Sequence, residues 1–211
     1  MMPWPSKRLE IPRGDTLVRV NLGCGLDYRE GWVNVDWNPT GALRVDRSFN
    51  LEDIPWPMAD HSVDYILMSH VAEHLRHGLL YGVTRRILTV LKHVAAGKPL
   101  SDADVQDIER LAAKDGWLAV IEEAYRILRP GGLLDVVAPG PWTPDAWRDP
   151  THARALEPDF WTYVSPDSIP TRRFYTTARF RLLRQEHLRS LDFRAPFRWI
   201  HFKDYHADKY L

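Results

Sequence analysis

A short predicted strand that ends at two closely spaced glycines, followed by a second strand that ends at a carboxylate, constrains this chain more than any other feature. Residues 17–22 (LVRVNL) lead into Gly23 and Gly25, and residues 32–36 (WVNVD) end at Asp36. Glycine lets the backbone approach a ligand where a side chain would collide. A carboxylate at the end of the neighbouring strand can accept hydrogen bonds from both hydroxyls of a ribose. The pattern therefore predicts a nucleoside site at the ends of two adjacent strands.

The rest of the first 140 residues alternates strand-like runs with helical patterns. Further strands are expected at residues 42–45, 63–68 and 133–138, where short apolar runs are bounded by turn residues. Strands separated by helices predict a mostly parallel sheet that is covered on both faces. We therefore expect a single α/β domain with a Rossmann-like, doubly wound sheet.

Three helical patterns separate the last two of these strands. Apolar residues recur at helical spacing over residues 80–94, 105–112 and 117–128. One crossover needs only one helix, so residues 78–115 are predicted to be a helical insertion that lies over the core. Additional packing is its simplest role, and a lid or a dimer surface is the alternative. Farther on, residues 180–191 and 198–205 predict a hairpin at the sheet edge, with its turn at Pro196.

The composition excludes several classes of protein. The chain has 211 residues, 28 Lys and Arg against 28 Asp and Glu, and 45% hydrophobic residues, which fits one globular domain. Its one cysteine, Cys24, cannot form an internal disulfide and fits a reducing compartment. No apolar run approaches the roughly 20 residues of a membrane-spanning helix, and residues 1–14 lack the pattern of a signal peptide. We therefore expect a cytoplasmic protein without a membrane partner.

The neutral total charge hides an uneven distribution. Residues 172–211 hold ten Lys and Arg against four Asp and Glu, a charge of +6, so residues 1–171 carry −6. A solvated surface is the simplest explanation of such a basic end. An anionic acceptor, or a nucleic acid bound at one edge, is the alternative.

The glycine segment is the first of several motifs that follow one another along residues 18–139. Residues 20–25 (VNLGCG) and 31–36 (GWVNVD) come first, and the later ones are residues 50–58 (NLEDIPWPM), 62–66 (SVDYI), 69–75 (SHVAEHL) and 123–132 (EAYRILRPGG). In this order they resemble the class I S-adenosylmethionine-dependent methyltransferases, most closely a small methyltransferase-11-like subgroup whose first crossover is short. The resemblance implies a seven-stranded, mostly parallel sheet with an antiparallel last strand.

The same resemblance implies S-adenosylmethionine as the cofactor and a role for individual residues. Asp36 would accept hydrogen bonds from the ribose hydroxyls, and Trp37 would pack beside the adenine. Asn50 stands where the family usually has the aspartate that accepts the adenine amino group, and an amide forms that bond without charge assistance. The expected cofactor-binding residues are Asn21, Leu22, Gly23, Cys24, Gly25, Asp36, Trp37, Asn50, Leu51, Ser69 and His70.

A first group of candidate catalytic residues follows the predicted strand at residues 63–68. His70, Glu73 and His74 begin a short helix at the carboxyl end of this strand, where such folds place reacting groups. His70 and His74 are four residues apart, so they would share a helical face, which could indicate a metal. We expect no metal, because Glu73 and His74 in the resembling family mostly hold the loop and helix in place.

A second candidate group is residues 149–152 (DPTH). His152 titrates near neutrality and could accept a proton, with Asp149 or Arg154 orienting the substrate. The structural alternative is an Asp-Pro turn whose histidine caps a backbone group. Residues 140–177 are rich in aromatic side chains, which would suit either an aromatic-walled acceptor pocket or ordinary core packing. These are Trp142, Trp147, Phe160, Trp161 and Tyr163.

The sequence thus predicts an S-adenosylmethionine-dependent methyltransferase that acts on a small-molecule acceptor, with His70, His152 and Asp149 as candidate catalytic residues. Two alternatives remain, a catalytically silent methyltransferase-like binding subunit and an NAD-dependent oxidoreductase. The oxidoreductase is disfavoured because the third glycine of a dinucleotide fingerprint is missing, with Tyr28 at its position.

Overall fold

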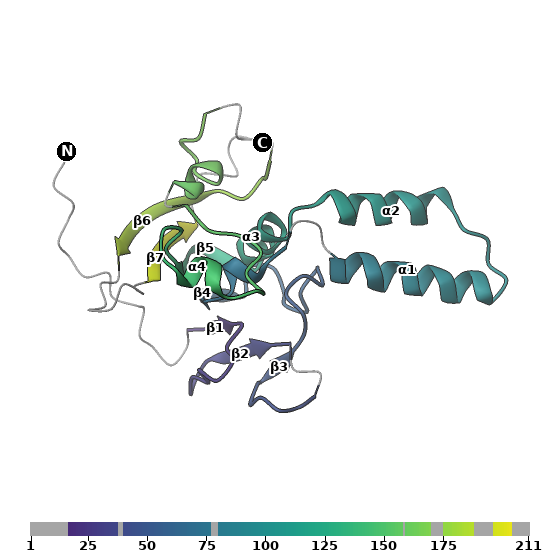
Figure 1. Cartoon of the computed structure of the whole chain (residues 1–211), viewed down its shortest axis with the longest axis horizontal. Coiled ribbons are helices and arrows are strands. Elements are labelled where there is room, and N and C mark those ends of the chain that lie inside the picture. The colour runs from purple at the N-terminus through teal and green to yellow at the C-terminus, as the bar shows by residue number, and fades with distance from the viewer. Residues whose placement is uncertain are drawn as a thin grey trace.

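The structure is a computed structural model and describes residues 17–37, 40–76, 80–157, 159–169, 175–187 and 196–203. At its centre lies a sheet with the strand order β3-β2-β1-β4-β5-β7-β6 (Figure 1). The five strands from β3 to β5 pair in parallel, which confirms the predicted Rossmann-like core. The strands are β1 (Arg19–Leu22), β2 (Val33–Asp36), β3 (Arg47–Ser48), β4 (Val63–Ser69), β5 (Leu128–Pro139), β6 (Phe180–His187) and β7 (Pro196–Lys203).

The helices occupy the connections between these strands. Four α-helices and two short 3₁₀ helices lie within the described residues. They are η1 (Ala72–His74), α1 (Leu80–Ala95), α2 (Asp102–Ala113), α3 (Gly116–Ile127), α4 (Asp145–Arg148) and η2 (Phe160–Tyr163).

The core forms where α3 packs on the central strands. Asp115 is the N-cap of helix α3. Its carboxylate accepts hydrogen bonds from the backbone N–H groups of Trp117 and Leu118 and so satisfies two donors of the first turn. The Trp117 side chain is fully buried and meets Trp161 edge-on, with ring centroids 5.7 Å apart. Because α3 and the parallel strands are buried together, the strand ends keep fixed positions relative to one another.

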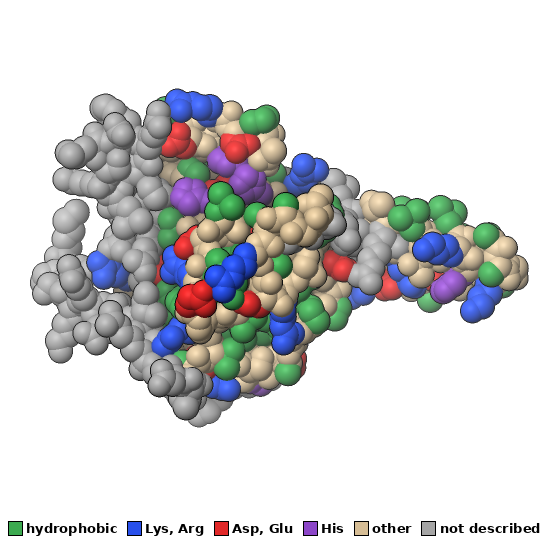
Figure 2. All heavy atoms as spheres, turned by 90° about the horizontal axis from the view of Figure 1, so that it is seen from below, with side chains coloured by type: hydrophobic (Ala, Val, Ile, Leu, Met, Phe, Trp, Pro, Cys, Tyr) green, Lys and Arg blue, Asp and Glu red, His purple; other side chains and the backbone are tan. Residues whose placement is uncertain are grey.

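Helices α1 and α2 project away from the body as a two-helix arm (Figure 1). Arg86 of α1 joins the helices through a 2.9 Å ion pair with Asp104 of α2. The helical pattern of residues 78–115 is thus confirmed over these two helices, but the arm does not lie over the core as expected. Amphipathic spacing predicts a helix without showing what its apolar face contacts, and Leu88, Leu91 and Leu100 are more than half exposed here. Figure 2 shows the hydrophobic side chains along this arm.

The third strand of the sheet lies at residues 47–48 and not at residues 42–45. The Asp46 carboxylate accepts hydrogen bonds from the backbone N–H and the side-chain amide of Asn34, at 2.7 and 2.9 Å. Arg44 instead stacks over the Tyr28 ring, 3.6 Å from its centroid. Pairing with β2 therefore begins only beyond Asp46.

The C-terminal hairpin also differs from the expectation. Strands β6 and β7 are antiparallel partners, but β7 is inserted between β5 and β6, so only β6 lies at the edge. Pro196 is the first residue of β7, opposite Pro139, where its missing N–H is tolerated. Residues 188–195, which contain the turn, lie outside the described residues, as do residues 204–205. Among the described residues, no helix has the length and apolarity needed to cross a bilayer.

Candidate functional site

A pocket of about 560 Å³ opens where β1, β2 and β4 end. This size falls in the range of small-molecule and cofactor sites. Its lining residues come from the loops after these three strands and after β3, from η1 and the residues that follow it, and from the first turns of α1. They are Gly23, Asp36, Trp37, Asn50, Leu51, Glu52, His70, Val71, His74, Leu75, Arg76 and Thr84. We call this the first pocket.

The glycine loop at the first pocket depends on two structural features of Gly23 and Gly25. Gly23 has a φ of +67°, and a Cβ atom at this position would lie 2.3 Å from Cγ2 of Val71. No side chain could occupy that space without displacing Val71. Gly25 donates its backbone N–H to the Asp36 carboxylate over 2.7 Å, so the loop after β1 and the end of β2 are joined. The two predicted strand ends therefore do meet.

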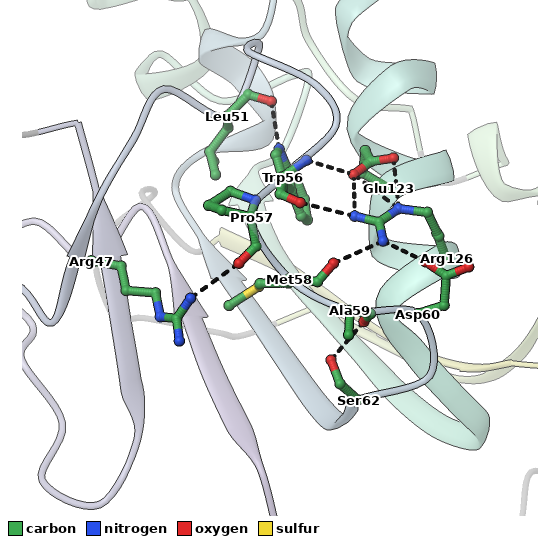
Figure 3. Close-up of polar contacts among 10 residues, drawn as sticks. All are labelled: Arg47, Leu51, Trp56, Pro57, Met58, Ala59, Asp60, Ser62, Glu123 and Arg126. Atoms are coloured by element: carbon green, nitrogen blue, oxygen red, sulfur yellow. Dashed lines mark hydrogen bonds and ion pairs between the residues drawn. The ribbon is translucent and has the colours of Figure 1, made fainter.

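The edge of the first pocket at Asn50 and Leu51 is held by the loop of residues 51–62 (Figure 3). The Trp56 indole donates to the Leu51 carbonyl at 2.9 Å, and the Trp56 backbone N–H donates to Glu123 of α3 at 2.8 Å. Arg126 of α3 donates to the carbonyls of Trp56 and Met58 and pairs with Glu123 and Asp60. The hydrogen bond with Glu123 is the main cause that raises the pKa of the Arg126 guanidinium, and Asp60 adds to it. The guanidinium is therefore always charged.

The expected adenine acceptor, Asn50, already uses its side-chain oxygen within this loop. That oxygen accepts a 2.9 Å hydrogen bond from the backbone N–H of Glu52. A carbonyl oxygen has two lone pairs, so a second donor can still bind there. Leu51 lines the first pocket from the same turn.

Five of the expected cofactor-binding residues do not line the first pocket. Leu22 is core, and the Asn21 side chain is buried against the Asp27 carbonyl, to which it donates at 2.7 Å. Burial raises the pKa of the Cys24 thiol, which disfavours its nucleophilic form. Sequence position alone does not distinguish a residue that faces the ligand from one that holds the loop. The five are Asn21, Leu22, Cys24, Gly25 and Ser69.

His70 lies between the first pocket and a second one. Its φ of +57° is unusual for a residue other than glycine, and it turns the chain sharply after β4. The side chain lines both pockets, and its Nδ1 lies 3.3 Å from Oε1 of the buried Glu73. This contact with Glu73 is the main reason that the pKa of His70 is raised.

The second pocket has a volume of about 450 Å³ and contains the predicted Asp149 and His152. The Asp149 carboxylate accepts hydrogen bonds from the Thr151 hydroxyl and backbone N–H, and these bonds lower the pKa of Asp149. His152 Nδ1 lies 3.2 Å from the carbonyl oxygen of Ala146. The lining residues are His70, Pro139, Asp145, Arg148, Asp149, Pro150 and His152.

Two of the alternatives that the sequence left open do not match the lining of the second pocket. Arg154 does not face the second pocket, because it donates to the Leu75 carbonyl and forms a 3.0 Å ion pair with Asp115 at the start of α3. The second pocket is also not aromatic-walled, since none of the five aromatic residues lines it. Trp161 is buried in the core, and Trp142 and Trp147 are exposed.

His70 and His74 do not share a helical face. His70 precedes η1 and turns toward Glu73, whereas the His74 ring meets the His152 ring edge-on with centroids 4.7 Å apart. His74 Nδ1 also lies 3.1 Å from the Thr151 hydroxyl. The backbone joins the same segments, because Glu73 accepts a 2.7 Å hydrogen bond from the N–H of Ala153.

Several pocket-lining residues could not be identified from the sequence. Glu52, Arg76 and Thr84 reach the first pocket, and Asp145 and Arg148 reach the second. Their positions depend on how loops and the base of α1 fold back over the strand ends. A charged residue near a predicted strand end was the only available signal, and many surface residues share it.

No family model matches the sequence, and no curated protein matches it. Among solved structures, a SAM-dependent methyltransferase from Archaeoglobus fulgidus is 13% identical, with a TM-score of 0.51 and coverage of 90% of this chain and 87% of that one. The citrinin polyketide synthase CMeT domain is 12% identical, with a TM-score of 0.51 and coverage of 92% of this chain and 48% of that one. The chain thus has the fold of the S-adenosylmethionine-dependent methyltransferases, as the sequence motifs predict.

Proposed function

We propose that this protein is an S-adenosylmethionine-dependent methyltransferase, with its cofactor in the first pocket and a small-molecule acceptor in the second. One observation carries the proposal: the two pockets adjoin, and His70 lines both. Transfer requires the activated methyl and the acceptor atom to meet, so two adjoining pockets with a shared lining residue suit this reaction.

The residues of the first pocket fit the proposed cofactor. The close contact of Gly23 with Val71 keeps the loop after β1 thin where the ligand would lie. Asp36 uses one oxygen to hold Gly25, and a carboxylate has further lone pairs to accept ribose hydroxyls. Trp37 lines the same pocket and is half exposed, and a tryptophan ring at this position suits stacking on adenine. As part of the same proposal, we assign β6 and β7 as the sixth and seventh strands of the methyltransferase fold, with β7 antiparallel to its neighbours β5 and β6.

When bound, the cofactor supplies a methyl group that is already activated as a sulfonium. The chain then has to hold the acceptor in line and exclude water. Where the acceptor atom carries a proton, His152 is the proposed base. Because the Ala146 carbonyl can only accept a hydrogen bond, Nδ1 of His152 carries the hydrogen, and Nε2 of the neutral ring is left to accept a proton.

The charges around the second pocket suggest the kind of acceptor. Arg148 is exposed and lines this pocket beside Asp145, Asp149 and two histidines. Arg148 also pairs with Asp145 over 3.6 Å. Such a mixed polar lining favours a small polar acceptor over an extended apolar one.

Calorimetry with S-adenosylhomocysteine and with NAD is the first test. Binding of S-adenosylhomocysteine and not of NAD is expected, and the reverse result would overturn the proposal. The second test is methyl transfer to a panel of small polar acceptors. Tight cofactor binding without turnover on any acceptor would favour a catalytically silent methyltransferase-like subunit.

A further inference from the structure

The Glu73 carboxylate is an unusual feature of the region between the two pockets. Its side chain is only 2% exposed, and neither oxygen accepts a hydrogen bond from the described residues. Among the residues that the structure describes, the 3.3 Å ion pair with His70 is the only polar contact of this carboxylate, and the imidazole of His70 is itself half exposed. A buried carboxylate without hydrogen bonds is costly unless a cation balances its charge.

Two histidines lie beside this carboxylate. A ligand atom from each of Glu73, His74 and His152 lies within 4.8 Å of the other two. The hydrogen bond from the Ala153 N–H to the Glu73 carbonyl holds the two segments together. Figure 2 shows histidine side chains gathered on one face of the body, with acidic side chains nearby.

The hydrogen bonds of the two histidines leave the same ring nitrogen available on each. The Ala146 carbonyl requires the hydrogen of His152 on Nδ1. The Thr151 hydroxyl gives its only hydrogen to Asp149 over 2.6 Å, so it can only accept from Nδ1 of His74. Both neutral rings therefore keep a lone pair on Nε2. Metal-binding histidines are usually oriented in this way, through the second nitrogen to a carbonyl or another acceptor.

We propose that Glu73, His74 and His152 form a binding site for a divalent transition-metal ion. Two histidines and one carboxylate are a donor set that suits Zn²⁺ or Fe²⁺ and leaves coordination positions open for a further ligand. Mg²⁺ and Ca²⁺ prefer oxygen donors and fit this set poorly. Side-chain rotations bring the three donors to bonding distance, and Glu73 then exchanges its contact with His70 for the ion.

The site lies between the two pockets, since His74 lines the first and His152 the second. Asp149 adds a second carboxylate, with Oδ2 3.9 Å from Nε2 of His152. On the basis of the function proposed above, an ion here would face the acceptor pocket and bind an acceptor heteroatom at an open position. In that metal-bound form Nε2 of His152 would be a ligand and not a base, so the role of His152 as a base applies to the metal-free protein. Metal binding itself does not depend on that function and can be measured without an acceptor.

The test is titration of Zn²⁺ into the chelator-treated full chain, followed by calorimetry, with Mg²⁺ as the comparison ion. One Zn²⁺ per chain with micromolar or tighter affinity is expected, and Mg²⁺ should not compete. Co²⁺ provides a second readout, because ligand-field absorption reports its coordination directly. Absence of saturable Zn²⁺ binding would overturn the proposal.

Variants locate the ion. Glu73→Gln and His152→Ala should each weaken Zn²⁺ binding at least tenfold and change the Co²⁺ spectrum. His93→Ala removes a histidine from the end of α1, away from the pockets, and should bind like the original chain. Unchanged Zn²⁺ affinity in both Glu73→Gln and His152→Ala would show binding elsewhere and overturn the site.

Measuring S-adenosylhomocysteine affinity beside Zn²⁺ affinity distinguishes a failure of the metal-site proposal from a failure of the proposed methyltransferase function. Asp36→Ala should lose S-adenosylhomocysteine affinity and keep Zn²⁺ affinity. Glu73→Gln should keep its circular dichroism spectrum and its S-adenosylhomocysteine affinity, which rules out misfolding as the cause of lost metal binding. A chain that binds Zn²⁺ and no cofactor would contradict only the methyltransferase function.

Discussion

Gly25 donates its backbone N–H to the Asp36 carboxylate over 2.7 Å and thereby joins the loop after β1 to the end of β2. The Asp36 carboxylate is thus both a candidate acceptor for the ribose hydroxyls and a support for the glycine loop. Two features that are separate in the sequence form one edge of the first pocket.

Removing this carboxylate should weaken cofactor binding. Asp36→Ala is expected to cost roughly 1–3 kcal/mol of S-adenosylhomocysteine binding free energy, because charge-assisted hydrogen bonds are lost. This corresponds to a decrease in affinity of about 5- to 150-fold in calorimetry. Asp167→Ala, an exposed aspartate that lines neither pocket, is the control. Equal affinities in the two variants would remove Asp36 from the site.

Gly23→Ala should destabilise the fold through two separate effects. The left-handed backbone costs a residue with a Cβ about 1–2 kcal/mol, and crowding against Val71 adds about 1–3 kcal/mol. Gly41→Ala is a matched control, since Gly41 has a similar φ of +70° but no atom within 4 Å of an added Cβ. Urea denaturation should show a larger loss for Gly23→Ala. In the double variant Gly23→Ala/Val71→Ala, the loss of stability should be smaller than the sum of the losses in the two single variants. A double-variant loss equal to that sum would exclude the crowding.

Arg126→Ala should loosen the loop of residues 51–62, because it removes donors to two loop carbonyls and the partner of Glu123. We expect a loss of about 2 kcal/mol in the free energy of unfolding, together with weaker cofactor binding at Asn50 and Leu51. The control is Arg110→Ala, whose arginine is 76% exposed on α2 and should change stability by less than about 0.5 kcal/mol. Similar results for both variants would mean that the loop is held by other contacts.

His152→Ala should lower turnover and leave the affinity for S-adenosylhomocysteine nearly unchanged, since His152 lines only the second pocket. Loss of a general base typically lowers the rate by about 100-fold or more. Steady-state kinetics on an accepted substrate and calorimetry measure the two quantities. A parallel loss of turnover and cofactor affinity would indicate that His152 acts through the structure of the site.

The Asp46 carboxyl group should make stability depend on pH. Hydrogen bonds from the backbone and side chain of Asn34 lower the pKa of Asp46 in the folded chain. A lowered folded-state pKa contributes stability above the unfolded-state pKa, and this contribution is lost as the pH falls through the folded-state value. The original chain should therefore be more stable than Asp46→Asn at neutral pH, and the difference should shrink on acidification. Urea denaturation across pH tests this, and a constant difference would contradict it.

Local sequence patterns determined the parallel core and the glycine–carboxylate edge of the first pocket. Gly23, Gly25 and Asp36 lie at strand ends, and the carboxyl ends of neighbouring parallel strands lie at the same edge of the sheet. Short strands, their turns and the amphipathic helices could be predicted for the same reason, because each depends on residues that are close in sequence.

Only the tertiary structure decided which side chains face the pockets and which residues meet across loops. Glu73 and His74 lie beside His152 because a backbone hydrogen bond from Ala153 crosses between two loops that are far apart in the sequence. The α1–α2 arm projects and Arg154 binds Asp115 for reasons of packing that no periodicity encodes. Contacts between loops depend on where the whole sheet places them, and a pattern of neighbouring residues does not contain that information.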